Sequence, residues 1–116
     1  MGKTSILVAD DNINLAKSLS FILGRKGYKT VIAKDGREAV KNVRDKSFDI
    51  IFMDIKMPIM NGIEAYRKIK KISPDTLVFM MTAYAVQELV EDALEVGASG
   101  ILYKPLDVEK LLRIVG

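Results

Sequence analysis

The sequence of 116 residues predicts a doubly wound α/β domain, in which helices cover both faces of a five-stranded parallel sheet. Five short apolar runs alternate with five segments whose apolar residues recur at helical spacing, and turn residues separate them. The short connections require right-handed crossovers, and each crossover helix must bury its apolar stripe against the sheet. The length predicts a single domain over residues 1–116.

The five predicted strands are short apolar runs, typical of strands that are buried on both faces. They are residues 6–9, 30–33, 50–53, 77–81 and the weaker 100–102. With the second strand at the edge of the sheet, in the order 2-1-3-4-5, strand order reverses between the first and third strands. Ligands bind at such a reversal, beside the carboxyl ends of the strands.

The five predicted helices lie between and after these strands, and each has one apolar stripe. The stripes are Leu15, Leu19, Ile22 and Leu23; Ala39, Val40 and Val43; Ile63, Tyr66, Ile69 and Ile72; Leu89, Ala93, Leu94 and Val96; and Val108, Leu111, Leu112 and Val115. Gly27 and Gly97 mark the ends of the first and fourth helices, and Asp107 is a predicted N-cap of the last.

The composition excludes several classes of chemistry. The chain has no His and no Cys, which removes the imidazole base, the Ser-His-Asp triad, the usual zinc ligands, thiol chemistry and disulfides. The net charge of +3 comes from scattered Lys and Arg residues, which favours a solvated surface over direct nucleic-acid binding. No apolar run is long enough for a signal peptide or a membrane span, so we expect a cytoplasmic protein without membrane partners.

Polar residues follow four of the predicted strands. Asp10, Asp11 and Asn12 come after the first strand, Asp54 after the third, Thr82 after the fourth and Lys104 after the fifth. The carboxyl ends of parallel strands meet at one edge, so the three aspartates should converge between the first and third strands.

Three neighbouring carboxylates repel one another and need a cation or a raised pKa. An all-oxygen site without His predicts Mg²⁺, with Mn²⁺ as the second choice. A carboxylate beside a divalent cation and the Lys104 ammonium is equipped to accept a phosphoryl group, and the Thr82 hydroxyl could bond a phosphoryl oxygen. Taken singly, each residue has a plainer interpretation as a cap, a turn residue or a surface side chain. Their joint occurrence at four strand ends favours the interpretation as a functional site.

The motifs Asp10-Asp11, Asp54 within residues 53–58, Asn61-Gly62, residues 81–83 and Lys104-Pro105 together resemble the receiver domain of two-component response regulators, from Ile6 to about Val115. The resemblance implies the flavodoxin-like form of the fold. It also implies signal transduction through an aspartyl phosphate on Asp54, donated by a histidine kinase or a histidine phosphotransfer protein in a phosphorelay.

The resemblance further implies that Asp10, Asp11, Asp54 and the backbone carbonyl of Lys56 hold Mg²⁺. Lys104 would then pair with the phosphoryl group, and the Lys104–Pro105 peptide bond would be cis. Two positions depart from the family pattern: Ile101 stands where many receivers have an aromatic switch residue, and Leu106 replaces a common Phe. Lys56 and Tyr84 lie two residues beyond Asp54 and Thr82, and we hypothesise that they form a rim that slows hydrolysis of the phosphoryl group.

The preferred function is therefore a phosphoacceptor that catalyses only its own modification and signals to a downstream protein target or by self-association. One alternative is a Mg²⁺-dependent phosphatase with an aspartate nucleophile, although Lys56 stands where such enzymes carry a second acid. A flavodoxin-type FMN carrier is weaker, because Asp10 and Asp11 would repel its phosphate. A constitutive binding module that is never phosphorylated also remains open, because Ile101 cannot act as an aromatic switch.

Overall fold

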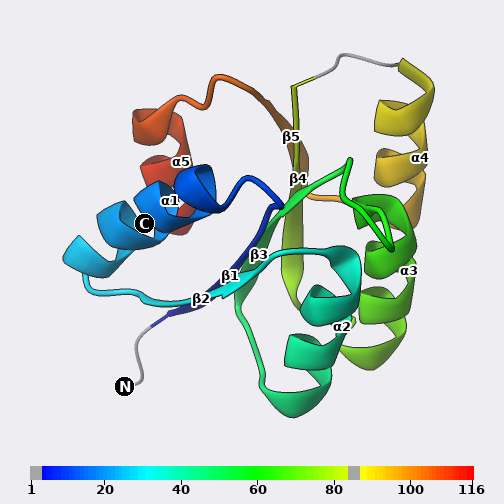
Figure 1. Cartoon of the computed structure of the whole chain (residues 1–116), viewed down its shortest axis with the longest axis horizontal. Helices are drawn as coiled ribbons and strands as arrows, with labels where there is room; N and C mark the ends of the chain where they lie inside the picture. The colour runs from blue at the N-terminus through cyan, green and yellow to red at the C-terminus, as the bar shows by residue number, and fades with distance from the viewer. Residues whose placement is uncertain (1–3, 84–86) are drawn as a thin grey trace.

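The computed structural model describes residues 4–83 and 87–116, in which five strands alternate with five helices (Figure 1). The strands are β1 Ser5–Ala9, β2 Lys29–Ala33, β3 Ile50–Asp54, β4 Leu77–Thr82 and β5 Gly100–Tyr103. The helices are α1 Ile13–Arg25, α2 Gly36–Asp45, α3 Gly62–Ile72, α4 Gln87–Val96 and α5 Val108–Val115. Every predicted strand and helix is confirmed, with strand ends shifted by one residue at most.

The sheet is parallel with strand order β2-β1-β3-β4-β5, as predicted. Helices α1 and α5 cover one face, and α2, α3 and α4 cover the other (Figure 1). The strand order reverses between β1 and β3, which pair directly from Ile6 with Ile50 to Ala9 with Met53. The predicted ligand-binding edge therefore lies at the carboxyl ends of these two strands.

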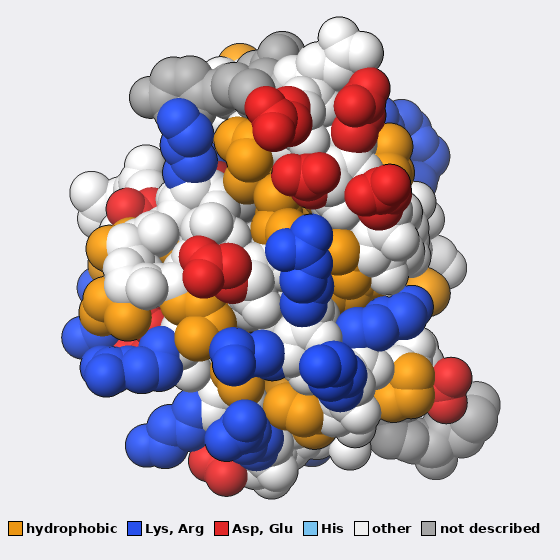
Figure 2. All heavy atoms as spheres, turned by 90° about the vertical axis from the view of Figure 1, so that its right-hand side faces the viewer, with side chains coloured by type: hydrophobic (Ala, Val, Ile, Leu, Met, Phe, Trp, Pro, Cys, Tyr) orange, Lys and Arg blue, Asp and Glu red, His pale blue; other side chains and the backbone are white. Residues whose placement is uncertain are grey.

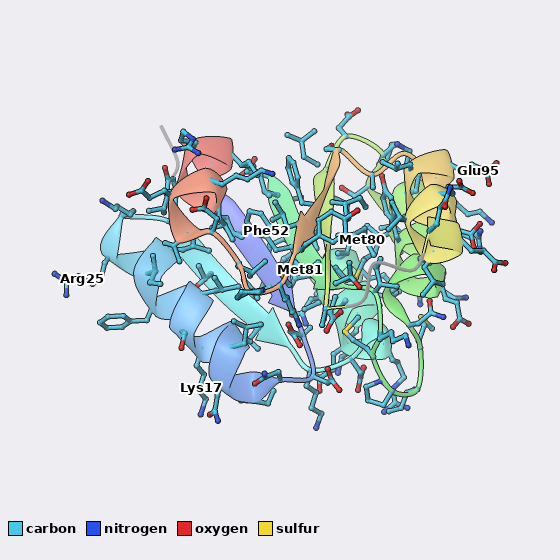
Figure 3. All side chains as sticks on the ribbon, turned by 90° about the horizontal axis from the view of Figure 1, so that it is seen from above. Lys17, Arg25, Phe52, Met80, Met81 and Glu95 are labelled. Carbon is cyan, nitrogen blue, oxygen red and sulfur yellow. The ribbon has the colours of Figure 1, made fainter. Side chains whose placement is uncertain are left out.

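Alternation along the central strands divides the core between the two faces. Phe52 and Met81 pack with the cluster beneath α1 and α5, whereas Met53 and Met80 pack with the cluster beneath α2, α3 and α4. Figure 3 shows Phe52 on the α1 and α5 side of the sheet and Met80 on the opposite side. Leu106, the replacement for the common Phe, packs against the first of these clusters.

Local signals in the sequence begin and end the helices. Asn12, Asp35, Asn61 and Asp107 are N-caps whose side chains accept backbone N–H groups, and Asn61 forms a reciprocal capping box with Glu64. Gly27 and Gly97 have positive φ just beyond α1 and α4, the left-handed conformation that glycine adopts without steric cost. The Lys104–Pro105 peptide bond is cis, as the resemblance implied. No helix within the described parts of the chain is long and apolar enough to cross a membrane.

Ile59 is a strained position in the loop between β3 and α3. Its φ is 70°, and its side chain is 71% exposed. A β-branched residue in the left-handed region costs about 1–2 kcal/mol, and exposure leaves little packing to offset that cost. We therefore expect Ile59→Gly to raise the free energy of unfolding by about 1 kcal/mol in urea titrations.

The matched control for this prediction is Ile72→Gly, which changes an exposed Ile at the end of α3. That residue is helical, so glycine there should lower the free energy of unfolding by about 0.5–1 kcal/mol. Equal losses in both variants would show that the Ile59 backbone is not strained.

Candidate functional site

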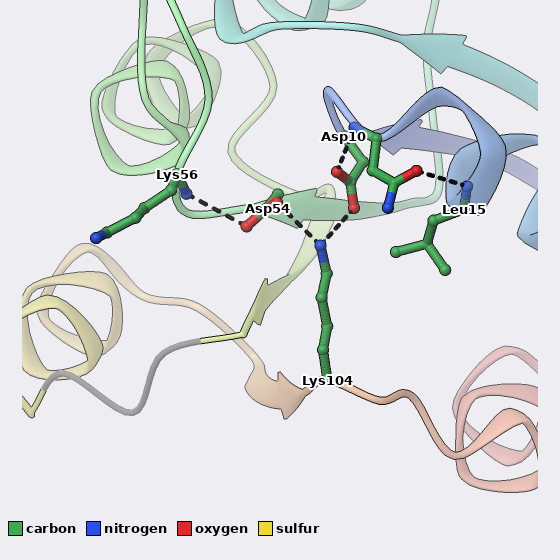
Figure 4. Close-up of polar contacts among 6 residues, drawn as sticks. Asp10, Leu15, Asp54, Lys56 and Lys104 are labelled. Atoms are coloured by element: carbon green, nitrogen blue, oxygen red, sulfur yellow. Dashed lines mark hydrogen bonds and ion pairs between the residues drawn. The ribbon is translucent and has the colours of Figure 1, made fainter.

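Three strand ends bring Asp10, Asp54 and Lys104 together. Asp10 directly follows β1, Asp54 is the last residue of β3, and Lys104 directly follows β5. The Lys104 Nζ donates to Asp10 Oδ2 at 2.8 Å and to Asp54 Oδ2 at 3.0 Å (Figure 4). Residues that lie 94 and 50 positions apart in the sequence therefore form one hydrogen-bonded cluster.

The cluster is largely shielded from solvent. The Asp10 side chain is 0% exposed, the Asp54 side chain 11% and the Lys104 side chain 17%. Coulombic interactions are stronger here than at the surface because little water screens the charges. One ammonium group between two buried carboxylates partly balances their repulsion.

Backbone N–H groups hold the second oxygen of each buried carboxylate. Asn12 N–H donates to Asp10 Oδ1 at 2.9 Å, and Lys56 N–H donates to Asp54 Oδ1 at 3.3 Å. The cap of α1 is the Asn12 side chain, which accepts from Leu15 N–H at 3.2 Å. Capping therefore explains Asn12 and leaves Asp10 and Asp11 for another role.

Asp10, Asp11 and Asp54 each offer a carboxylate oxygen, and these three atoms lie within 4.8 Å of one another. Asp11 is exposed, while Asp10 and Asp54 are buried, so the group opens to solvent on one side. Hard oxygen donors in this number suit Mg²⁺, which keeps several water ligands of its own. The donor set therefore fits the divalent cation expected from the sequence.

Burial and hydrogen bonding act in opposite directions on the charged groups. Burial raises the pKa of Asp54, and the hydrogen bond from Lys104 only partly offsets this, while the Asp10 charge adds to the rise. Burial by itself would lower the pKa of Lys104, but its hydrogen bonds to Asp10 and Asp54 outweigh that effect and raise it. Lys104 is thus held protonated between the two carboxylates. The ionised form of Asp54 is less favourable here than it would be in water.

The comparisons with known proteins identify the family. A family model described as the response regulator receiver domain matches residues 6–116. The chain belongs to this family. The transcriptional regulatory protein ZraR of Klebsiella oxytoca is 40% identical over 109 residues, which are 94% of this chain and 25% of that protein. The chain thus spans a quarter of the length of that relative.

Solved structures agree with this receiver fold. A CheY-like receiver domain from Methanospirillum hungatei has a TM-score of 0.95 and 31% identity, covering 98% of this chain and 91% of that one. A Burkholderia pseudomallei response regulator, solved with a phosphorylated aspartic acid, calcium and citrate, has a TM-score of 0.91 and 29% identity. That match covers 98% of this chain and 67% of the other.

Thr82 and Ile101 lie on the paired strands β4 and β5. Thr82 is the last residue of β4 and is 2% exposed, and its carbonyl accepts Lys104 N–H at 2.8 Å. The end of β4 thus fixes the backbone of Lys104. Ile101 is partly buried against the core cluster beneath α2, α3 and α4, while Tyr103 is 52% exposed.

Of the two residues of the hypothesised rim, the structure describes only Lys56. The Lys56 side chain is exposed, and Figure 4 shows it pointing away from Asp54. Its backbone N–H, and not its ammonium group, reaches the Asp54 carboxylate. Tyr84 lies outside the described residues, so the rim hypothesis remains a prediction.

Two glycines position the loop after β3, and the sequence alone predicts neither of them as a site residue. Gly62 N–H donates to the Ile55 carbonyl at 2.8 Å, and Gly36 N–H donates to the Met60 carbonyl at 3.1 Å. A Cβ on Gly62 would lie 2.1 Å from the Asp54 carbonyl oxygen, and one on Gly36 would lie 2.2 Å from the Met60 carbonyl oxygen. Both glycines are needed because backbone approaches them too closely for any side chain.

Magnesium should stabilise this receiver domain through the three aspartates. At a concentration about five times its Kd, Mg²⁺ should raise the free energy of unfolding by about 1 kcal/mol relative to chelator at equal ionic strength. Asp11→Asn should remove most of this increment, because it deletes the exposed carboxylate of the cluster. Urea unfolding with and without Mg²⁺ measures the increment. The control is Asp75→Asn, a substitution at an exposed loop residue, which should retain the Mg²⁺-dependent increment. An undiminished increment in Asp11→Asn would exclude this cation site.

Proposed function

We propose that this receiver domain accepts a phosphoryl group on Asp54 from a phosphohistidine of a histidine kinase or a histidine phosphotransfer protein. The observation that carries the proposal is the position of the Lys104 Nζ, within 3.0 Å of carboxylate oxygens of both Asp10 and Asp54. A buried carboxylate beside a fixed ammonium group and two further carboxylates is the arrangement that phosphoryl transfer to a carboxylate needs.

The transfer begins with the Asp54 carboxylate as nucleophile. One of its oxygens attacks the phosphorus in line, the new O–P bond forms, and the P–N bond to the donor imidazole breaks. Burial leaves the ionised carboxylate poorly solvated, which raises its pKa. Binding of cationic groups and bond formation to phosphorus both relieve this poor solvation.

Asp10, Asp11 and Asp54, together with the backbone carbonyl of Lys56, would hold Mg²⁺. When bound, the cation neutralises charge on the phosphoryl oxygens. The carboxylate oxygens within 4.8 Å of one another support this assignment. The related Burkholderia regulator solved with a phosphorylated aspartic acid and a calcium ion supports the same pairing of modification and divalent cation.

The remaining site residues would respond to the new charge. Lys104 would move its hydrogen bonds from the carboxylate oxygens to the phosphoryl oxygens, and the Thr82 hydroxyl would bond another of them. Because the Thr82 carbonyl accepts Lys104 N–H, movement of one residue would shift the backbone of the other. Ile101 has no aromatic ring to turn inward, so the change would pass through the end of β4 and the loop beyond it.

The test is the mass of the intact protein after incubation with acetyl phosphate and Mg²⁺, with a parallel sample in chelator. We expect a gain of one phosphoryl group in Mg²⁺ and none in chelator. Absence of any gain would favour the constitutive binding module. Continuous release of phosphate without accumulation of modified protein would favour the aspartate-nucleophile phosphatase.

A further inference from the structure

One face of the molecule carries two adjacent patches of opposite charge. Figure 2 shows Asp and Glu side chains gathered in the upper part of this face and Lys and Arg side chains gathered below them. The acidic patch belongs to α4, a helix with four acidic residues and no Lys or Arg. Its members are Glu88, Glu91, Asp92 and Glu95.

The basic patch belongs to α2 and α3. These two helices carry seven Lys or Arg residues against three acidic ones. Arg37, Lys41 and Arg44 recur at helical spacing along α2, and with Lys68 of α3 they line an open groove of about 250 Å³. Val40, Met60 and a single acidic residue, Asp45, also line the groove, so it offers apolar contacts and a net positive charge.

The two patches are matched in charge and in position. Helix α4 has a net charge of −4, and α2 with α3 has a net charge of +4. Helix α3 packs against both α2 and α4, so the patches lie side by side on one face and not on opposite faces. A rotation of 180° about an axis in the plane of this face, passing between the two patches, lays each patch on the opposite patch of a second copy.

We propose that two copies of this chain pair through the α2–α3–α4 face about such a two-fold axis. The acidic α4 of each copy then lies against the basic α2–α3 groove of the other, and the contact is made twice. Such an interface is self-complementary and closes at two copies, whereas patches on opposite faces would build an open chain. A free polyanion fits less well, because α4 would repel it beside the groove.

Charge reversal tests this pairing. The acidic-patch variant is Glu91→Lys with Glu95→Lys, and the basic-patch variant is Arg37→Glu with Lys41→Glu. None of these residues belongs to the Asp54 site, so both variants should keep the wild-type rate of phosphorylation by acetyl phosphate, which also controls for folding. Sedimentation velocity over a range of concentrations at low salt measures association.

We expect the wild type to form dimers that weaken about tenfold or more when salt screens the charges. Each variant alone should be monomeric, because the double substitution brings the net charge of the altered patch to zero and removes the attraction in both contacts. An equimolar mixture of the two variants should dimerise again, because the unaltered acidic α4 of one variant meets the unaltered basic groove of the other, and the introduced lysines meet the introduced glutamates.

Four outcomes would overturn the proposal. One is a wild type that stays monomeric at every concentration, and another is dimerisation that survives in both variants. Growth beyond two copies would indicate a head-to-tail chain. A monomeric wild type whose heparin binding is lost in the basic-patch variant would assign the groove to a polyanion.

Discussion

Lys104→Met is expected to lower the free energy of unfolding by about 3 kcal/mol at neutral pH in chelator, the lower end of the range for a buried ion pair that loses one partner. The substitution keeps most of the side-chain volume and removes the ammonium group that donates to Asp10 and Asp54. Two buried carboxylates then face each other without a cation. The reduction is at the lower end because 17% of the Lys104 side chain remains exposed.

The pH dependence of this loss has a definite sign. The pKa of Asp54 is already raised by burial, and removing Lys104 raises it further. A carboxyl group whose pKa is higher in the folded state destabilises the fold as pH rises through that pKa. The Lys104→Met deficit should therefore be largest at neutral pH and should shrink on acidification, as the carboxyl groups take up protons.

The control is Lys17→Met on the outer face of α1, where the side chain points into solvent (Figure 3). It should change the free energy of unfolding by less than about 0.5 kcal/mol. Adding Mg²⁺ should restore part of the stability lost in Lys104→Met. Equal unfolding curves for the two variants in chelator would contradict the electrostatic account of the site.

Gly62→Ala is expected to lower the free energy of unfolding by about 3 kcal/mol and to slow phosphorylation by acetyl phosphate. A Cβ at this position would lie 2.1 Å from the Asp54 carbonyl oxygen and 2.9 Å from the Met80 Cε. The Met80 side chain can turn aside, but the Asp54 carbonyl cannot move without displacing the backbone of the phosphoacceptor. Stability and reactivity should therefore fall together.

Gly24→Ala is the matched control for this prediction. Gly24 lies within α1, and an added Cβ would meet nothing within 4 Å. Alanine there should raise the free energy of unfolding by about 0.5–1 kcal/mol, because it restricts the unfolded chain and favours the helix. Thermal unfolding curves and phosphorylation rates of both variants, measured under the same conditions, test this prediction. Wild-type reactivity in Gly62→Ala would show that this glycine does not position Asp54.

The elements of the fold could be predicted from the sequence because their local and long-range signals agree. The run from Ile50 to Met53 is apolar at every position, and the structure buries both of its faces. The Asp107 cap and the glycines after α1 and α4 fix the helix ends in the sequence itself. Right-handed crossovers then leave few arrangements of five parallel strands.

The site could be predicted as a set of residues but not as a geometry. Strand ends converge on one edge, which places Asp10, Asp54 and Lys104 together, yet the two hydrogen bonds of the Lys104 Nζ depend on side-chain rotamers that the sequence does not specify. The close approach of the Asp54 carbonyl to Gly62 depends on the path of the loop. Ile59 has a left-handed backbone conformation, which β-branched residues disfavour, so the residue type at this position does not predict the conformation.

The most direct test of the central claim is the position of the phosphoryl group. The wild type and Asp54→Asn are each incubated with acetyl phosphate and Mg²⁺, reduced with borohydride to convert an acyl phosphate into a stable alcohol, and mapped by peptide mass spectrometry. We expect the modified residue to be Asp54 in the wild type and no modification in Asp54→Asn. Modification of Asp10 or Asp11 in the wild type, or undiminished modification of the variant, would contradict the assignment of Asp54 as the acceptor.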